Sequence, residues 1–298
     1  MTGLAVCGAA YCFLPMALER VIRDVYYVDS DRLRAHQLDV YLPQYRTFWD
    51  APRPLVIWIH GGAWRGFDKS ATPAAILPHF GYVAASINYR STNEAKFPAQ
   101  LDDVKSAIRY MRAHCHDYGC DPQKIGVWGV SSGGHLAALV GLSGCQQKSE
   151  KMSVVGEKLE TASDVDRFPS VQAVSDWCGP TDFTTITAQT GRCDELHLKD
   201  PNGPVAKLLG GLPSQVPEMA KLASPVYHVC RNAPPFLIVH GAKDDTVPEQ
   251  QSKELVQCLT DFHVPNTYHL LPNGNHDFTT AELILETIKY FDGYLKPH

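Results

Sequence analysis

Short, wholly apolar runs alternate along the chain with longer segments in which apolar side chains recur every three or four residues. LVIWIH at 55–60 and PFLIVHG at 235–241 are typical of strands that are covered on both faces of a sheet. Two early runs, the second ended by Pro43, also contain many β-formers. The predicted strands cover residues 24–29, 37–42, 55–60, 82–89, 124–130, 171–177, 235–241 and 266–272.

Helical spacing predicts helices over residues 98–115, 132–142, 248–262 and 279–294. Strands that alternate with helices indicate parallel βαβ units. We therefore predict the α/β class, with a doubly wound, mostly parallel sheet and helices on both of its faces. Residues 1–23 are expected to form an N-terminal arm, and residues 24–298 a single domain.

Two stretches interrupt this alternation. Residues 144–170 are polar and charged, and residues 179–233 are rich in Gly, Pro and Thr. Both begin near predicted carboxyl ends of strands, where open α/β sheets bind their ligands. We predict that these irregular insertions form the wall or the lid of a pocket.

Composition narrows the possible partners and compartments. The 298 residues carry a net charge of -5, which argues against nucleic acid as a partner. The first eighteen residues are apolar but carry no Lys or Arg, and they are too few for a membrane span. We expect no stable membrane insertion and a cytoplasmic protein; a secreted or membrane-associated protein is the alternative. Its oligomeric state is left open.

The nine cysteines form no CxxC pair, so neither a zinc site nor a disulfide framework is indicated. Most of them are expected to be buried free thiols. The pairs closest in sequence, Cys7 with Cys12 and Cys115 with Cys120, are candidates for a disulfide.

A glycine-rich turn, GVSSGG, follows the predicted strand at 124–130 and precedes a helix. Gly129, Ser131 and Gly133 have the GxSxG spacing of a nucleophile elbow, in which small flanking residues allow a sharp turn that exposes one hydroxyl. The spacing selects Ser131, because Ser132 lacks the first glycine. The turn has neither the lysine nor the glycine set of a phosphate-binding loop.

HGGAW at 60–64 follows another predicted strand. Its small residues allow the main chain to turn N–H groups toward a developing negative charge. We assign an oxyanion hole to the backbone amides of Gly62, Ala63 and Ser132, the last of which begins a helix. A plain strand-ending turn, with His60 as a structural residue, is the alternative.

Candidates for the acid and the base follow the last strands. HGAKDDTVP offers Asp244 and Asp245, and Asp182 competes from an earlier loop. A carboxylate in such a position can orient an imidazole. His276, in PNGNHDF, lies after both the serine and the aspartates, which gives the chain order Ser, Asp, His.

Taken together, HGGAW, GVWGVSSGGHLAALVG, DWCGPTDF, HGAKDDTVP and NGNHDF resemble the α/β-hydrolase superfamily, and within it the BD-FAE and esterase/lipase-like serine hydrolases related to hormone-sensitive lipase. The resemblance covers about residues 24 to 295. It implies that Asp244 is the acid, Ser131 the nucleophile and His276 the base. Three departures are Ala63 for a frequent glycine, Ser132 for a common alanine, and NHDF for GHGF; none of them removes a catalytic atom.

These residues predict a serine carboxylesterase that cleaves small or medium-sized esters through an acyl-enzyme and needs no metal or organic cofactor. Its expected partner is a small-molecule ester. One alternative is an arylformamidase-type amidase, since such enzymes of the superfamily also use HGGxW. Another is a ligand-binding homologue that has lost catalysis. Acyl and alcohol preference depend on the two insertions, where no motif provides guidance.

Overall fold

A sheet of eight strands forms the centre of the computed structural model, which describes residues 19–44, 51–147, 170–190 and 196–296. The strand order is β1-β2-β4-β3-β5-β6-β7-β8. β1 and β2 pair antiparallel, as do β2 and β4, and the remaining pairs are parallel. The strands are β1 (Glu19–Tyr26), β2 (Gln37–Pro43), β3 (Arg53–Ile59), β4 (Val83–Ile87), β5 (Cys120–Val130), β6 (Ala173–Trp177), β7 (Phe236–Gly241) and β8 (Asn266–Leu271).

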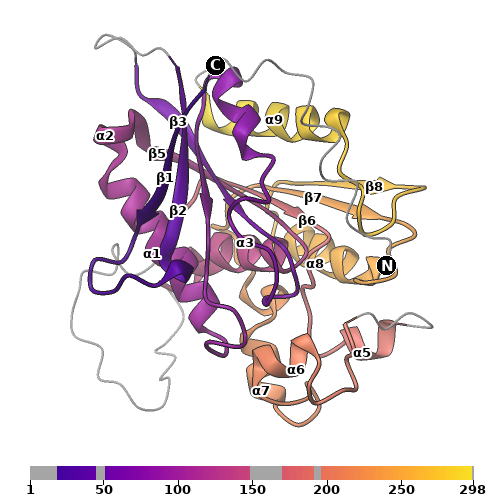
Figure 1. Ribbon diagram of the computed structural model, residues 1–298. Coiled ribbons are helices and arrows are strands. Elements are labelled where there is room, and N and C mark those ends of the chain that lie inside the picture. The colour runs from indigo at the N-terminus through magenta and orange to yellow at the C-terminus, as the bar shows by residue number, and fades with distance from the viewer. Residues whose placement is uncertain (1–18, 45–50, 148–169, 191–195, 297–298) are drawn as a thin grey trace.

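Helices cover both faces of this sheet, and the predicted α/β fold is confirmed (Figure 1). α1 (Ala99–Ala113), α3 (Ser132–Leu142) and α8 (Glu249–Asp261) lie on one face, and α9 (Ala281–Leu295) lies on the other. Alternate residues of β3 serve the two faces: Leu55 and Ile57 pack in the first core, Val56 and Trp58 in the second. A wholly apolar run therefore suits this central strand, since both of its faces are buried.

The first strand differs from its prediction. It runs from Glu19 to Tyr26, earlier than the predicted 24–29, so residues 19–23 of the predicted arm lie in β1. Its pairing with β2 shifts register between Ile22 and Val25, and Asp24 has a positive φ of 57°. This bulged edge strand mixes charged and apolar residues, so no apolar run marks where it begins.

Part of the second predicted insertion, 179–233, is helical rather than irregular. It contains α5 (Ile186–Gln189), α6 (Pro204–Leu209) and α7 (Pro217–Leu222), which Figure 1 places together below the sheet. Each helix has only four to six residues, too few to show a helical period. Most of the first insertion, 148–169, lies outside the described residues.

The expectation that most cysteines are free thiols is wrong for the described part of the chain. Cys115 pairs with Cys120, which confirms one candidate disulfide, and Cys145 pairs with Cys230. Cys178 and Cys258 are free. The second disulfide joins positions 85 residues apart and ties the segment after α7 to the segment that follows α3, a pairing that spacing did not suggest. Cys7 and Cys12 lie outside the described residues.

Shorter helical pieces complete the description. They are η1 (Arg34–His36), η2 (Ala74–Phe80), α2 (Cys115–Tyr118), η3 (Ser143–Gln147) and η4 (Pro225–His228). Within the described ranges, no helix has the length and apolar character needed to cross a membrane.

Candidate active site

Ser131 occupies the sharp turn between β5 and α3. Its φ of 55° is unusual for a residue with a side chain, and such strain is concentrated at functional sites. The turn requires glycine on both sides, because a Cβ on Gly129 would collide with the Gly133 carbonyl and one on Gly133 with the Ile59 carbonyl. The Ser131 amide donates to the Trp177 carbonyl at 2.7 Å, which ties the turn to β6.

The structure brings Ser131, His276 and Asp244 into one chain of hydrogen bonds. His276 Nε2 lies 3.0 Å from Ser131 Oγ, and His276 Nδ1 lies 2.8 Å from Asp244 Oδ2. The three residues come from the turn after β5, the loop after β7 and the loop after β8. Because these strands are parallel neighbours, their carboxyl ends meet at one edge of the sheet.

Asp244 is held as a carboxylate. Its side chain is fully buried, and Oδ1 accepts hydrogen bonds from the amides of Thr246 and Val247 at 2.9 and 2.8 Å. Burial by itself raises the pKa of Asp244, but the hydrogen bonds and charges of His240 and His276 outweigh it and bring the pKa well below the usual range.

The pKa of His276 is shifted in the opposite direction. Burial lowers its pKa, whereas its neighbours raise it, and the net pKa lies well above the ordinary value. Cys178 is one of these neighbours, but burial raises the pKa of its thiol, so it is uncharged when the imidazole titrates. We attribute the raised pKa of His276 to the negative charge and hydrogen bond of Asp244.

The HGGAW loop lies beside Ser131. A Cβ added to Gly61 would lie 3.5 Å from Ser131 Cβ, and Gly62, Ala63 and Trp64 have positive φ values of 102°, 52° and 55°. Among the described residues, no backbone hydrogen bond uses the N–H groups of Gly62, Ala63 or Ser132. These three amides therefore remain available to a ligand.

A buried histidine in α3, His135, joins this loop to the helix. Trp64 Nε1 donates to His135 Nδ1 at 3.1 Å, and His135 Nε2 lies 2.7 Å from the Ala223 carbonyl. Burial lowers the pKa of His135 to about 4, so the ring is neutral and carries its proton on Nε2. His135 thus connects the HGGAW loop, α3 and the segment after α7.

Comparison with known proteins identifies the family of this chain. The BD-FAE family model matches residues 38–259, which is most of the chain. The chain belongs to the BD-FAE family. It is 31% identical, over 89% of its length, to the probable carboxylic ester hydrolase LipM of Mycobacterium tuberculosis. It spans 53% to 59% of the length of the first three curated relatives that it matches, all mycobacterial.

Solved structures of relatives point to the same group. A truncated carbohydrate esterase from gut microbiota superposes with a TM-score of 0.79 and 32% identity, covering 93% of this chain and 96% of that one. A bifunctional GH43-CE protein of Bacteroides eggerthii gives a TM-score of 0.77 and 34% identity, covering 92% of this chain and 38% of that one. The resemblance to an α/β-hydrolase esterase family is confirmed.

The other two acid candidates of this BD-FAE chain lie elsewhere. Asp245 is exposed, and no described hydrogen bond or ion pair uses its carboxylate. Asp182 Oδ1 accepts from the amide and hydroxyl of Thr184, a bond pattern typical of a turn. Only Asp244, of the three, contacts His276.

Sequence reasoning missed a second histidine behind Asp244. His240 is fully buried; its Nε2 lies 2.9 Å from the Val247 carbonyl and 3.3 Å from Asp244 Oδ2, and its Nδ1 lies 2.7 Å from Ser252 Oγ. Since a carbonyl and a carboxylate oxygen only accept, Nε2 carries a proton. The i,i+4 spacing of His240 and Asp244 within one motif was the available signal.

In the described part of the chain, one cluster of side chains has ligand atoms close enough together to hold a metal ion. Ligand atoms of Cys178, Asp244 and His276 lie within 4.8 Å of one another. Asp244 and His276 already bond to each other and to Ser131. The hydrogen-bonded chain to the serine accounts for their placement without an ion.

Proposed function

We propose that this BD-FAE protein hydrolyses carboxylic esters through an acyl-enzyme formed on Ser131. The observation that carries the proposal is the continuous chain of hydrogen bonds from Ser131 Oγ through His276 to Asp244. The strained turn at Ser131 and the available amides of the HGGAW loop add support.

In the first half-reaction, Ser131 Oγ attacks the ester carbonyl while its proton passes to His276 Nε2. Asp244, bonded to Nδ1, stabilises the imidazolium that forms. The amides of Gly62, Ala63 and Ser132 donate to the oxyanion of the tetrahedral intermediate. The acyl C–O bond then breaks, and His276 returns the proton to the departing alcohol.

In the second half-reaction, His276 takes a proton from water as the water oxygen attacks the acyl carbon. A second tetrahedral intermediate collapses with cleavage of the bond to Ser131 Oγ, which regains its proton from His276. The products are a carboxylic acid and the free enzyme. Each step uses the side chains of the triad, backbone amides and water.

The relatives support this reaction class, because the curated and solved relatives include a probable carboxylic ester hydrolase and a carbohydrate esterase. Their names support esters in general as substrates. They leave the acyl and alcohol parts open, and the curated relatives are considerably longer than this chain.

A fluorophosphonate probe tests the nucleophile. The wild-type protein should be labelled, and fragmentation of the peptide containing residues 126–139 should place the adduct on Ser131. Ser131→Ala should abolish labelling, and Ser132→Ala, which keeps its backbone amide, should still be labelled. Equal labelling of wild type and Ser131→Ala would contradict the proposal.

Substrate turnover separates ester from amide hydrolysis. We expect faster cleavage of 4-nitrophenyl acetate and butyrate than of N-formylkynurenine. The reverse order would indicate the amidase. Absence of labelling and of all turnover would indicate a ligand-binding homologue.

A further inference from the structure

His240 lies behind the triad and takes no part in the steps proposed above. It precedes the last residue of β7, and its side chain is fully buried. Its Nδ1 lies 2.7 Å from Ser252 Oγ, near the start of α8. Its Nε2 donates to the Val247 carbonyl at 2.9 Å and lies 3.3 Å from Asp244 Oδ2. Both ring nitrogens therefore have partners within the protein interior.

Two imidazole rings meet at one oxygen of Asp244. Oδ2 accepts from His276 Nδ1 at 2.8 Å, and the Nε2–H of His240 lies beside the same oxygen. The other oxygen, Oδ1, accepts from the amides of Thr246 and Val247. These two amides hold the carboxylate independently of either ring. The two histidines therefore share the charge of an oxygen whose position is already fixed.

The ring of His240 is itself held in one orientation. Val247 closes a loop of contacts, because its amide donates to Asp244 while its carbonyl accepts from His240. On the other side of the ring, Ser252 follows Gln251, whose side chain accepts from two amides of the loop after β6, at 2.9 and 2.8 Å. The Nε2–H of His240 is therefore kept beside the carboxylate before a substrate binds.

Three carboxylates face His240. Asp244 lies in contact with it, while Asp176 of β6 and Glu249 at the start of α8 act on the ring through their charges. Asp176 is fully buried, its Oδ2 has no hydrogen-bond partner among the described residues, and burial raises its pKa to about 6. His240 therefore presents a donor to a region of negative charge, which such a donor stabilises.

The groups around His276 make the charge on Asp244 decisive. Ser131 offers a neutral hydroxyl, and burial raises the pKa of the Cys178 thiol, so neither of these groups is charged at neutral pH. Asp244 therefore supplies the negative charge that raises the pKa of His276. A donor that offsets part of the charge on Asp244 Oδ2 weakens this effect.

We propose that His240 is a positioning residue for ester hydrolysis, which fixes Asp244 Oδ2 against His276 and offsets part of its charge. The inference rests on the proposed function of Ser131 and His276. In each half-reaction His276 must take up a proton and then release it. A carboxylate with undiminished charge would retain the imidazolium and leave less of the neutral base at neutral pH. His240 therefore keeps more of the base in its active form.

The pH profile of kcat/KM for 4-nitrophenyl acetate tests this role. His240→Leu, which removes the Nε2–H, should move the midpoint of the rising limb upward by about 0.5 to 1 pH unit. At neutral pH, kcat/KM should then be roughly threefold to tenfold lower, and most of this loss should disappear on the alkaline plateau. A merely structural role would lower the whole profile without moving its midpoint.

Two further variants keep the role testable if His240→Leu does not fold. In His240→Gln, the side-chain amide can place an N–H where Nε2 stands, so this variant should restore the wild-type midpoint. In His240→Asn, the shorter amide reaches only the position of Nδ1, so its midpoint should rise as in the leucine variant.

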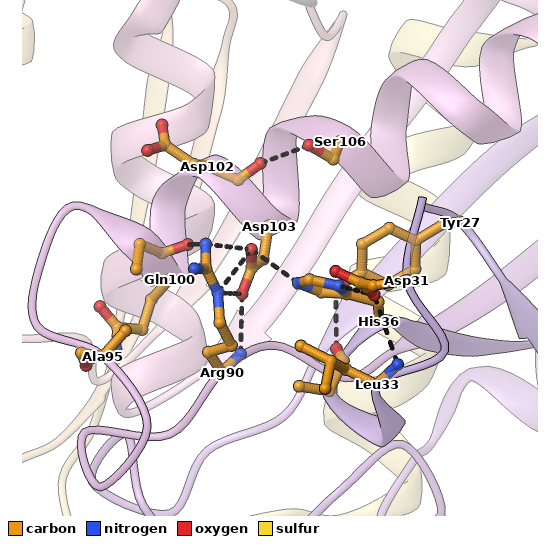
Figure 2. A network of polar contacts seen from close by, with 12 residues as sticks. Tyr27, Asp31, Leu33, His36, Arg90, Ala95, Gln100, Asp102, Asp103 and Ser106 are labelled. Atoms are coloured by element: carbon orange, nitrogen blue, oxygen red, sulfur yellow. Dashed lines mark hydrogen bonds and ion pairs between the residues drawn. The ribbon is translucent and has the colours of Figure 1, made fainter. Parts of the chain in front are cut away.

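His36→Leu is the matched control, because His36 is also a buried histidine beside a buried carboxylate. Its Nε2 lies 3.2 Å from Asp103 Oδ1, which also accepts from Arg90 at 2.7 Å (Figure 2). None of the hydrogen bonds described for these three residues reaches the triad. His36→Leu should lower the free energy of unfolding in urea, as His240→Leu does, but it should leave the midpoint of the pH profile unchanged.

Labelling by the fluorophosphonate gives a second measurement that needs no ester. Its rate should show the same pH midpoints as kcat/KM, since His276 activates Ser131 in both reactions. An unchanged or lowered midpoint in the folded His240→Leu and His240→Asn variants would overturn the role of His240 while leaving ester hydrolysis intact. If the wild type is neither labelled nor active on 4-nitrophenyl acetate, the proposed function itself fails.

Discussion

Two histidines near the turn at Ser131, the partly buried His276 and the fully buried His135, behave differently. The His276 ring contacts a carboxylate and a hydroxyl, and its pKa is raised. The His135 ring contacts an indole N–H and a backbone carbonyl, and burial lowers its pKa to about 4. Burial opposes the charge on both rings, so their partners make the difference.

The contrast separates a histidine that can exchange protons from one that cannot. A carboxylate on one nitrogen stabilises the imidazolium, which suits His276 to the proposed role of accepting the Ser131 proton. The Trp64 indole N–H can donate to His135 Nδ1 only while the ring is neutral, and the neutral ring then serves as a rigid connection between elements. The kind of partner therefore distinguishes the proposed base from a structural residue.

The largest effect is expected from removal of the proposed base. His276→Ala should lower kcat/KM by at least roughly a thousandfold, because no group remains to accept the Ser131 proton. Circular dichroism and urea unfolding should resemble those of the wild type. A loss below tenfold would mean that His276 and His135 are both structural.

Removing the charge of Asp244, the carboxylate that contacts His276 and not His135, should have the next largest effect. Asp244→Asn should lower kcat/KM by roughly a hundredfold to a thousandfold, a smaller loss because the serine and imidazole remain. Asp245→Asn is the matched control, and its activity should stay close to that of the wild type, since Asp245 is exposed. A larger loss in Asp245→Asn would show that the wrong aspartate has been assigned.

His135→Ala should affect stability more than chemistry. The substitution leaves a cavity and two unpaired polar groups, Trp64 Nε1 and the Ala223 carbonyl, which should cost about 2–4 kcal/mol of unfolding free energy. Urea unfolding measures this loss, with fully exposed His116→Ala as the control. Near-normal stability with a thousandfold loss of rate would overturn the distinction between the two rings.

The smallest expected effect is a difference between the pH dependence of activity and the pH dependence of stability. Only the neutral His276 accepts a proton, so kcat/KM should rise with pH through a midpoint above 6.5, and Asp244→Asn should move that midpoint to lower pH. His135 has a depressed pKa; its contribution to stability is present above pH 6.5 and is lost as the pH falls toward about 4. Activity and the free energy of unfolding in urea should be measured over the same pH range. As the pH is lowered, activity should fall before stability does. Coincident curves would contradict this order.

Features that depend on local sterics and periodicity could be predicted from the order of the residues. Apolar runs at 55–60 and 235–241 predicted buried strands because both of their faces lie within cores. The predicted helix at 132–142 is observed with the same bounds. Gly129 and Gly133 marked the turn at Ser131, since only glycine avoids a collision there. The order of the motifs then predicted which histidine approaches the serine.

Tertiary structure alone decided which side chains meet. Asp244 and Asp245 are neighbours in sequence, and only the course of the loop after β7 directs one of them toward His276. Three contacts join residues from separate elements: that of His240 with Ser252, that of Trp64 with His135, and the Cys145–Cys230 disulfide. Side-chain hydrogen bonds and disulfides act over a few ångströms, and residues far apart in the chain come that close only when the sheet is assembled.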